Sequence, residues 1–209
     1  MQIDVIADFV CPWCFIGRRR LARAMASRPG IAFDVKHRPY RLDPSLPRQG
    51  MDRKAYLAAR FPDGKGLIEA HRIIAQEGEK EDIAFAWDAI ERAPSTIDAH
   101  RLARWAETWG VQDDVVERLF AAYFENGDDI GDIRVLADIA DIAGMDGAEI
   151  ANLLESDTDI ANVEREDKLA HEMGVSGVPA MIFGGRIAVT GAREPDILLT
   201  AIDKAAEES

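Results

Sequence analysis

Two cysteines separated by two residues are the most reactive feature of this 209-residue sequence. They are Cys11 and Cys14, with Pro12 and Trp13 between them, and the chain has no other cysteine. At the start of a helix, the unpaired N–H groups of the first turn and the helix dipole stabilise a thiolate, and proline suits that turn. Cys11 would then be the nucleophile, and Cys14 the resolving thiol that displaces the partner from a mixed disulfide. The motif therefore predicts dithiol–disulfide exchange.

Two other interpretations of the cysteine pair use the same residues. The pair could be half of a zinc site, but zinc needs four ligands, and the four histidines are scattered singly along the chain. Two inert, buried cysteines would leave the proline and the strand-to-helix context unexplained. A purely structural disulfide would close a very short loop and stabilise little. We therefore predict no metal site, and no cofactor beyond the redox-active disulfide itself.

A Val-Pro pair near the C-terminal end is the second candidate site. Val178 and Pro179 come just before a short apolar run. A cis-proline in such a place leaves the backbone of the preceding residue free to pair with an extended substrate. We predict a cis Val178–Pro179 bond opposite Cys11. Pro12, Trp13, Val178 and Pro179 are then the expected substrate-binding residues.

Asp8 is an acidic residue close to the motif. It ends the first predicted strand, three residues before Cys11. Its carboxylate could accept N–H groups at the helix entry, or it could take a proton during exchange. A carboxylate close to the sulfur would also oppose thiolate formation. Of these roles, the sequence favours capping of the helix.

The elements that must position these residues lie at the two ends of the chain. The first forty residues predict a strand over Ile3–Phe9, a helix over Pro12–Ala26 and a strand over Ile31–Arg38. The last fifty residues predict a helix, a two-stranded hairpin and a final helix. Their expected bounds are Asp159–Met173, Ala180–Phe183, Arg186–Thr190 and Glu194–Ala206.

The middle of the chain has helical periodicity and almost no strand pattern. The candidate helices are Lys54–Phe61, Leu67–Glu77, Ile97–Trp109, Asp113–Glu125, Ile133–Ala143 and Ala148–Glu155. Neither end of the chain can cover its own strands, so the two ends must pack together. The predicted fold class is α/β, a thioredoxin-like fold with a large all-α insertion after the second strand. The expected domains are a discontinuous thioredoxin-like domain (1–48 and 158–209) and a helical insertion domain (49–157).

Composition and charge exclude some classes of partner. The chain is 47% hydrophobic and 30% charged, with a formal net charge of −13. Such an acidic surface repels nucleic acid and anionic lipid, so we expect neither as a partner. No segment approaches the roughly 20 apolar residues that span a bilayer. Asp4 and Asp8 interrupt the apolar run at the N-terminus, which does not resemble a secretory signal. We expect a cytoplasmic protein.

Four blocks of the sequence resemble the FrnE-like branch of the DsbA family. They are Phe9–Cys14 with Gly17, His37–Pro44, Ser95–Leu102 and Gly174–Pro179. The resemblance spans nearly the whole chain and implies a thioredoxin fold with a helical insertion, with dithiol–disulfide exchange at Cys11, Cys14 and Pro179. Pro94 stands where the family often has Asn. His100 is a candidate to face the cleft, although a lone histidine on a helix is more often structural.

The same superfamily leaves two alternative functions open. It contains 2-hydroxychromene-2-carboxylate isomerases and kappa-class glutathione transferases, which carry Ser at the place of Cys11 and use glutathione as the thiol. The cysteine pair favours the oxidoreductase, with glutathione as a candidate co-substrate. The non-enzymatic alternative is a thioredoxin-like chaperone or binding module. The expected partners are thiol- or disulfide-containing proteins or small molecules, and a homodimer is compatible with the sequence.

Overall fold

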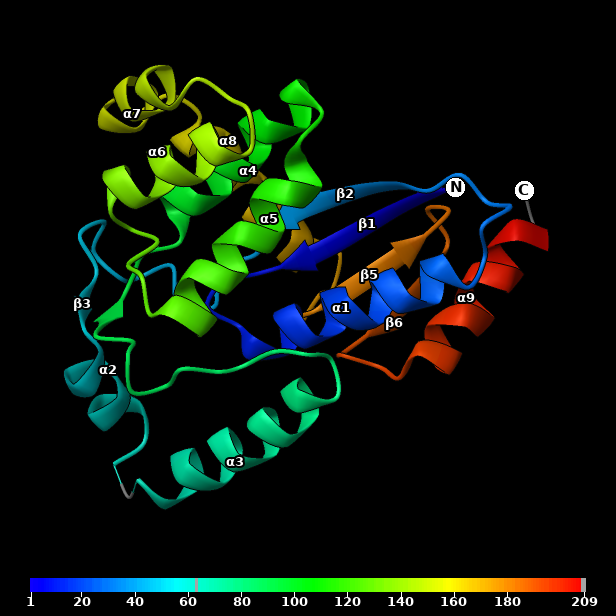
Figure 1. The fold of residues 1–209 in the computed structure, drawn as a ribbon, viewed down its shortest axis with the longest axis horizontal. Coiled ribbons are helices and arrows are strands. Elements are labelled where there is room, and N and C mark those ends of the chain that lie inside the picture. The colour runs from blue at the N-terminus through cyan, green and yellow to red at the C-terminus, as the bar shows by residue number, and fades with distance from the viewer. Residues whose placement is uncertain (63, 208–209) are drawn as a thin grey trace.

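The computed structural model describes residues 1–62 and 64–207. A four-stranded sheet lies at the centre of the thioredoxin-like part of the fold (Figure 1). Its strands are β1 (Gln2–Ala7), β2 (Asp34–Pro39), β5 (Ala180–Phe183) and β6 (Ile187–Thr190). They lie in the order β2-β1-β5-β6, and β1 pairs parallel to β2 and antiparallel to β5. Strands from the two ends of the chain therefore meet at β1, and the predicted α/β fold class is confirmed.

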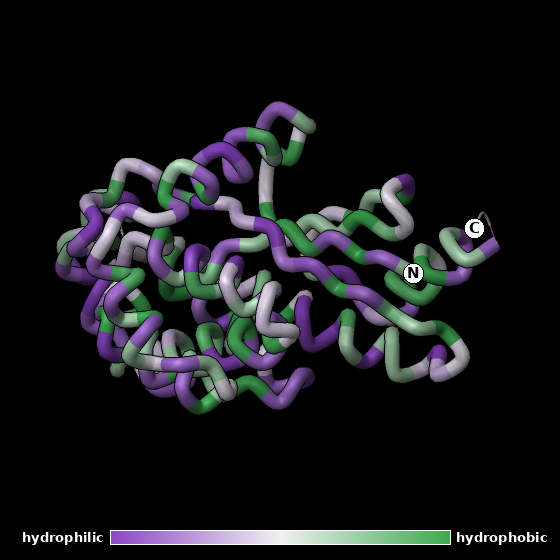
Figure 2. The backbone as a smooth tube through the Cα atoms, turned by 90° about the horizontal axis from the view of Figure 1, so that it is seen from above, coloured by the Kyte–Doolittle hydropathy of each residue, from purple (hydrophilic) through white to green (hydrophobic). Residues whose placement is uncertain are grey.

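Two helices from the two ends of the chain pack against each other, and three of the others contact strand β2 of the sheet. The first two are α1 (Pro12–Ala26) and α9 (Pro195–Glu207), which contact each other. The others are α2 (Arg53–Arg60), α3 (Lys65–Glu79), α4 (Ile97–Trp109), α5 (Gln112–Ala121), α6 (Ile133–Ile142), α7 (Gly147–Glu155) and α8 (Ile160–Glu172). Figure 2 shows both termini at one end of the molecule and most of the helical chain at the other.

Most predicted elements are present, with shifts of a few residues at their ends. The helices Pro12–Ala26 and Ile97–Trp109 have the predicted bounds. The long helix expected to follow α4 instead ends as α5 and continues as the π-helical turn η1 (Ala122–Asn126). The sequence analysis missed β3 (Met51–Asp52) and β4 (Arg92–Ala93), which pair antiparallel. Two residues are too few for an alternating pattern to be visible.

The predicted domain boundaries remain a proposal. The sheet contains no strand from residues 49–157 among those that the structure describes, while β3 and β4 form their own small sheet inside that segment. Residues 208 and 209, at the end of the predicted discontinuous domain, lie outside the described residues.

An aromatic cluster fixes the helix that begins at the cysteine pair. Phe15 is fully buried and stacks on Phe120 of α5, with ring centroids 5.3 Å apart and planes 7° apart. Phe124 of η1 stacks on Phe15 from a centroid distance of 6.3 Å. Full burial of one such ring contributes about 1.5–3 kcal/mol. The cluster therefore holds α1 against the helical part of the chain.

A buried arginine fixes α4 in the same way. Arg101 has no exposed surface, and its Nη1 donates to Asp98 at 2.5 Å. The guanidinium also donates to main-chain carbonyls in the last turn of α7 and in the loop that follows it. The acceptors are the carbonyls of Leu153, Leu154, Ser156 and Thr158. One side chain thus satisfies four main-chain carbonyls at the end of α7 and in the loop after it.

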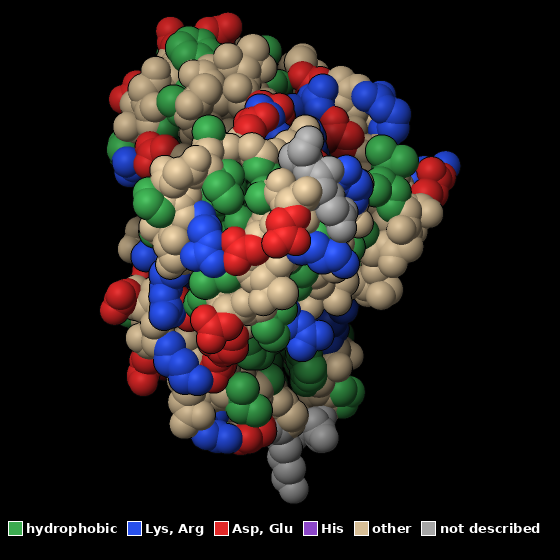
Figure 3. Space-filling model, turned by 90° about the vertical axis from the view of Figure 1, so that its right-hand side faces the viewer, with side chains coloured by type: hydrophobic (Ala, Val, Ile, Leu, Met, Phe, Trp, Pro, Cys, Tyr) green, Lys and Arg blue, Asp and Glu red, His purple; other side chains and the backbone are tan. Residues whose placement is uncertain are grey.

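The molecular surface carries charges of both signs. On the face drawn in Figure 3, acidic and basic side chains are interspersed with apolar ones, and no single-sign patch dominates. Among the helices of residues 1–62 and 64–207, none combines the length and the apolar character needed to cross a bilayer.

Candidate active site

The N-terminus of α1 positions the two cysteines. Cys11 is the N-cap residue and Pro12 is the first helical residue, and the backbone N–H of Cys14 donates to the carbonyl of Cys11 at 2.9 Å. Both cysteines are free thiols. Both are buried, Cys11 with 6% and Cys14 with 2% of its surface exposed. The pair therefore sits at the helix entry with Cys14 the deeper thiol.

The environment of Cys14 favours the protonated form of its thiol. Burial raises the pKa of the Cys14 thiol well above its ordinary value, and the neighbouring Cys11 raises it further. The backbone of Asp8 lowers this pKa through a hydrogen bond, whereas the charge of the Asp8 carboxylate raises it. Cys14 is therefore a thiol at neutral pH and must lose its proton before it can attack a disulfide.

The Val178–Pro179 segment lies against Cys11. The peptide bond is cis, which confirms the prediction. The Cys11 Sγ donates to the carbonyl of Val178 over 3.7 Å, across 167 positions of sequence. The structure thus brings Cys11 and the Val-Pro pair together, as the substrate-groove hypothesis requires.

Gly17 permits the close approach of α1 to Pro179. A Cβ atom at Gly17 would lie 3.0 Å from the Pro179 ring and 3.4 Å from Met181. We expect Gly17→Val to destabilise the fold by about 1–3 kcal/mol, because its branched side chain overpacks this contact. We also expect it to slow exchange by moving α1 away from Pro179. Denaturant unfolding and an exchange assay measure the two effects.

Gly17→Ala is the matched control for that substitution. Its single methyl group requires a shift of only a few tenths of an ångström at the Pro179 ring. Alanine also gains about 0.5–1 kcal/mol over glycine inside a helix, which offsets this strain. Equal stability and equal activity of the two variants would show that the contact between α1 and Pro179 does not need a glycine.

The two residues between the cysteines face different surfaces. Trp13 lines an open groove together with Val178, the preceding Ser176–Gly177 segment and the loop Thr190–Arg193. Pro12 lines a deeper cavity of about 280 Å³ between α1 and the helical part of the chain. The groove and the cavity therefore each reach one of the two residues that separate the cysteines.

The cavity is mostly apolar, with charged groups at a few points. Arg53 and Arg60 line it, and Asp43 pairs with Arg60 at 2.7 Å. One wall is aromatic, where His71 stacks on Trp87 with centroids 4.2 Å apart. Tyr56, Pro94 and Tyr123 also line it. Apart from Pro94, these residues were not predicted from the sequence, because they come from separate helices and loops whose meeting no spacing reveals.

Asp8 does not cap α1, so the favoured sequence interpretation is wrong. No side chain caps this helix, and it is the main-chain carbonyl of Asp8 that accepts from the N–H of Cys11, at 3.1 Å. The carboxylate turns toward the loop after β2, where its Oδ2 accepts from the N–H of Leu42 at 2.7 Å. The His37–Pro44 block contains Leu42, but its pattern does not show which side chain the loop meets.

The free oxygen of Asp8 faces His100. Asp8 Oδ1 and His100 Nε2 are 3.4 Å apart, and both residues are at least 95% buried. Within the described part of the chain, neither atom has a hydrogen-bond partner. The structure thus brings together Asp8 and His100, which are 92 positions apart and were both predicted to lie near the cysteine pair.

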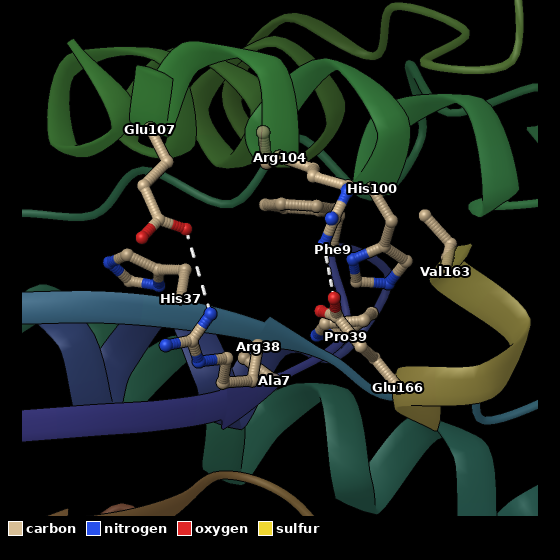
Figure 4. Close-up of a pocket in the computed structure, with 11 residues that line it drawn as sticks. Ala7, Phe9, His37, Arg38, Pro39, His100, Arg104, Glu107, Val163 and Glu166 are labelled. Carbon is tan, nitrogen blue, oxygen red and sulfur yellow. Dashed lines mark hydrogen bonds and ion pairs between the residues drawn. The ribbon is translucent and has the colours of Figure 1, made fainter. Parts of the chain in front are cut away.

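His100 also lines a narrow crevice between α4 and β2, drawn in Figure 4. Its ring packs on Phe9 with centroids 4.8 Å apart. His37 of β2 lines the same crevice, and burial lowers the pKa of His37, partly opposed by Asp113 at 3.8 Å. Arg104 and Glu166 form an ion pair beside the His100 ring in Figure 4. The sequence analysis did not identify His37 as part of a site.

The cysteines do not belong to a larger cluster of metal-ligating side chains. In residues 1–62 and 64–207, no group of three or more His, Cys, Asp or Glu is arranged to hold a metal ion.

Sequence comparison gives one family and one curated relative. Residues 2–203 match the family described as DSBA-like thioredoxin domain. The chain is 28% identical over 205 residues to the uncharacterized protein YwbO of Bacillus subtilis (strain 168), covering 97% of this chain and 96% of the relative.

Solved structures share the whole fold. A probable DsbA oxidoreductase from Streptomyces coelicolor is similar with a TM-score of 0.89 and 24% identity, over 100% of this chain and 91% of that one. A 2-hydroxychromene-2-carboxylate isomerase gives 0.74 and 15%, over 100% and 97%. The cytosolic disulfide reductase DsbM of Pseudomonas aeruginosa, solved with glutathione, gives 0.67 and 18%, over 100% and 96%. At these identities the likeness shows the fold.

Proposed function

Because the chain belongs to the family of DsbA-like thioredoxin domains, we propose that it exchanges a Cys11–Cys14 dithiol and disulfide with a thiol or disulfide substrate. One observation carries the proposal. The Cys11 sulfur contacts the Val178 carbonyl beside the cis Pro179, at the entry of a helix. Helix-start N–H groups and the helix dipole stabilise a thiolate there, and the adjacent backbone is available to an extended substrate.

The exchange has two steps, written here for a substrate disulfide. The Cys11 thiolate attacks one substrate sulfur, the substrate S–S bond breaks, and one substrate thiolate leaves. The Cys14 thiol then loses its proton and attacks the Cys11 sulfur, which releases the second substrate thiolate and forms the Cys11–Cys14 disulfide. Two electrons pass from the protein to the substrate. The reverse sequence oxidises a substrate dithiol.

Asp8 is the proposed acceptor of the Cys14 proton. Its carboxylate is buried and interacts with Cys14, whose raised pKa makes proton loss the obstacle to the second step. We expect Asp8→Asn to slow that step by about 100-fold at neutral pH, within the usual range for loss of a positioned base. Asparagine can still accept from Leu42 N–H, so the fold should persist.

The pH profile separates the two effects of this carboxylate. Its charge also raises the pKa of the Cys14 thiol, so its removal lowers that pKa. The difference between wild type and Asp8→Asn should therefore shrink as the pH rises and hydroxide deprotonates Cys14 directly. Stopped-flow measurement of the second step across pH checks this. An Asp8→Asn protein that is equally fast or faster at neutral pH would mean that the carboxylate acts only as an opposing charge.

The equilibrium of the cysteine pair with glutathione tests the proposed function itself. Mixtures of reduced and oxidised glutathione should convert the protein between dithiol and disulfide, with both cysteines required. Insulin reduction and refolding of scrambled ribonuclease then measure activity on protein substrates. A pair that stays unreactive toward glutathione and toward protein disulfides would refute the proposal.

We place the protein in the FrnE-like branch and in the cytoplasm. The four sequence blocks support the branch, and the similar disulfide reductase DsbM of Pseudomonas aeruginosa, which is described as cytosolic, supports the location. Glutathione is the proposed small-molecule co-substrate, because the cavity beside Pro12 can hold a small molecule and the similar DsbM structure contains glutathione. The homodimer remains a prediction that sedimentation equilibrium can measure.

The same cavity favours the glutathione-dependent isomerase or transferase as the second candidate function. It places arginine side chains and an aromatic wall next to the residue that follows Cys11. That alternative requires turnover of a chromene carboxylate or of an electrophile in the presence of glutathione, without any change in the redox state of the cysteine pair.

A further inference from the structure

We propose that His100 passes protons between Asp8 and solvent through the crevice at the β2 edge of the sheet. The inference rests on the proposed function and extends it, because it assigns a route to the proton that Cys14 must lose. His100 touches no reacting sulfur, and it acts through Asp8.

The contact between Asp8 and His100 is the first observation. Asp8 Oδ2 is occupied by the N–H of Leu42, so Oδ1 is the oxygen left for a proton. It faces His100 Nε2 at 3.4 Å. Neither atom has another partner within the described residues. Buried polar atoms without partners are unfavourable, and a shared proton between these two would satisfy both.

The crevice behind His100 is the second observation. His100 lines its inner wall, and the cavity volume of about 20 Å³ is enough for one water molecule. Its outer lining includes the partly exposed side chains of Arg104, Glu107 and Glu166. A proton that reaches His100 can therefore continue to bulk water.

The charged surroundings of His100 come from each element packed against it. Asp8 faces it from the loop after β1, Arg104 lies on its own helix, and Glu166 reaches in from α8. Arg38 and His37 contribute from β2. The Arg104–Glu166 ion pair is neutral overall, and Asp8 Oδ1 lies 3.4 Å from Nε2 of the ring.

The position of the crevice explains why a separate route is useful. The sheet order β2-β1-β5-β6 places β2 on one side of β1 and β5, which follows Pro179, on the other. A substrate bound beside Val178 and Pro179 covers the cysteines from the β5 side. The route through His100 opens at the β2 edge, and so it stays open to solvent during the second exchange step.

The proton balance is simple. When Cys14 attacks the Cys11 sulfur of the mixed disulfide, its proton passes to Asp8 Oδ1, then to His100 Nε2. His100 releases a proton to water in the crevice, and the departing substrate thiolate takes up a proton from solvent. No electrons move along this route. In the reverse direction the same groups return a proton to Cys14.

Single-turnover oxidation of the reduced protein by dithiobis(nitrobenzoate) tests the route. This reagent releases one coloured thiolate when Cys11 attacks, and a second when Cys14 resolves the mixed disulfide. In His100→Gln we expect an unchanged first phase and a second phase about tenfold slower at neutral pH, less than the loss expected from removal of a base itself. His37→Gln is the matched control, since it removes another histidine of the same crevice whose side chain is only 6% exposed and which faces Asp113 instead of Asp8.

Imidazole rescue provides the readout that a purely structural role would not give. In His100→Ala, added imidazole should restore the second phase and leave the first unchanged. Equal slowing of both phases, equal slowing by His37→Gln, or no response to imidazole in the folded His100→Ala protein would overturn the relay. If the wild-type protein shows both phases, the proposed oxidoreductase function stands even when the relay fails. Failure of the relay is therefore distinguishable from failure of the proposed function.

Discussion

Cys11→Ser should abolish dithiol–disulfide exchange, with a loss of at least about 1000-fold in rate, because a serine hydroxyl does not ionise at neutral pH. The fold should survive the change. The side chain is small and buried, and a hydroxyl can still donate to the Val178 carbonyl that the thiol contacts. Insulin reduction and the two-phase colorimetric reaction measure the loss.

Cys14→Ser is the matched control for this prediction. It should retain the first phase, release a single coloured thiolate and accumulate a stable mixed disulfide on Cys11. The two variants also distinguish the oxidoreductase from the two alternative functions. A chaperone would keep its activity in Cys11→Ser, and a glutathione-dependent isomerase would keep turnover in Cys14→Ser. More than a few per cent of residual exchange in Cys11→Ser would show that another group attacks the substrate.

Arg101→Leu should lower the free energy of unfolding by about 3–5 kcal/mol, the usual penalty for breaking one side of a buried ion pair. The substitution leaves the buried Asp98 without its Arg101 partner and removes the donor to carbonyls at the end of α7 and in the loop after it. For a chain of this size the expected fall in Tm is about 6–20 °C. Thermal and denaturant unfolding measure both quantities.

Arg118→Leu is the control with the same chemical change. Arg118 is partly exposed on α5 and pairs with Asp114 one helical turn away. Pairs of this kind contribute about 0.3–0.5 kcal/mol, so this variant should unfold nearly as the wild type does. Similar losses in the two variants would mean that the charge, rather than the buried hydrogen bonds of Arg101, carries the effect.

Local rules were enough to predict where the cysteine pair lies in the fold. The residues Cys11–Cys14 follow a strand and begin a helix, so their placement needs only the strand pattern, the proline and the helix periodicity. The cis bond at Pro179 followed from the Val-Pro pair before a strand together with the upstream cysteines. The first prediction used only neighbouring residues, and the second added the cysteine motif, 167 positions before Val178.

The features that the sequence did not predict depend on packing between residues that are far apart in the chain. The side chain of Asp8 had two directions open to it, and the loop containing Leu42 determined which it took. The role of Arg101 depends on carbonyls about 50 residues further along the chain. No periodicity or motif reports such a meeting, since it depends on how α7 and α8 pack on α4. The cavity beside Pro12 was missed for the same reason.

The sheet joins the first strand of the chain to a strand near its end, and this has a consequence during synthesis. Val178 is 167 residues beyond Cys11. At typical translation rates of 5–20 residues per second, the cysteine pair emerges from the ribosome about 10–30 s before the segment that completes its groove. In a growing chain, the two thiols are therefore accessible and not yet covered by the Val178–Pro179 segment. The assembled site, with its buried Cys14, exists only after the last quarter of the protein has been made.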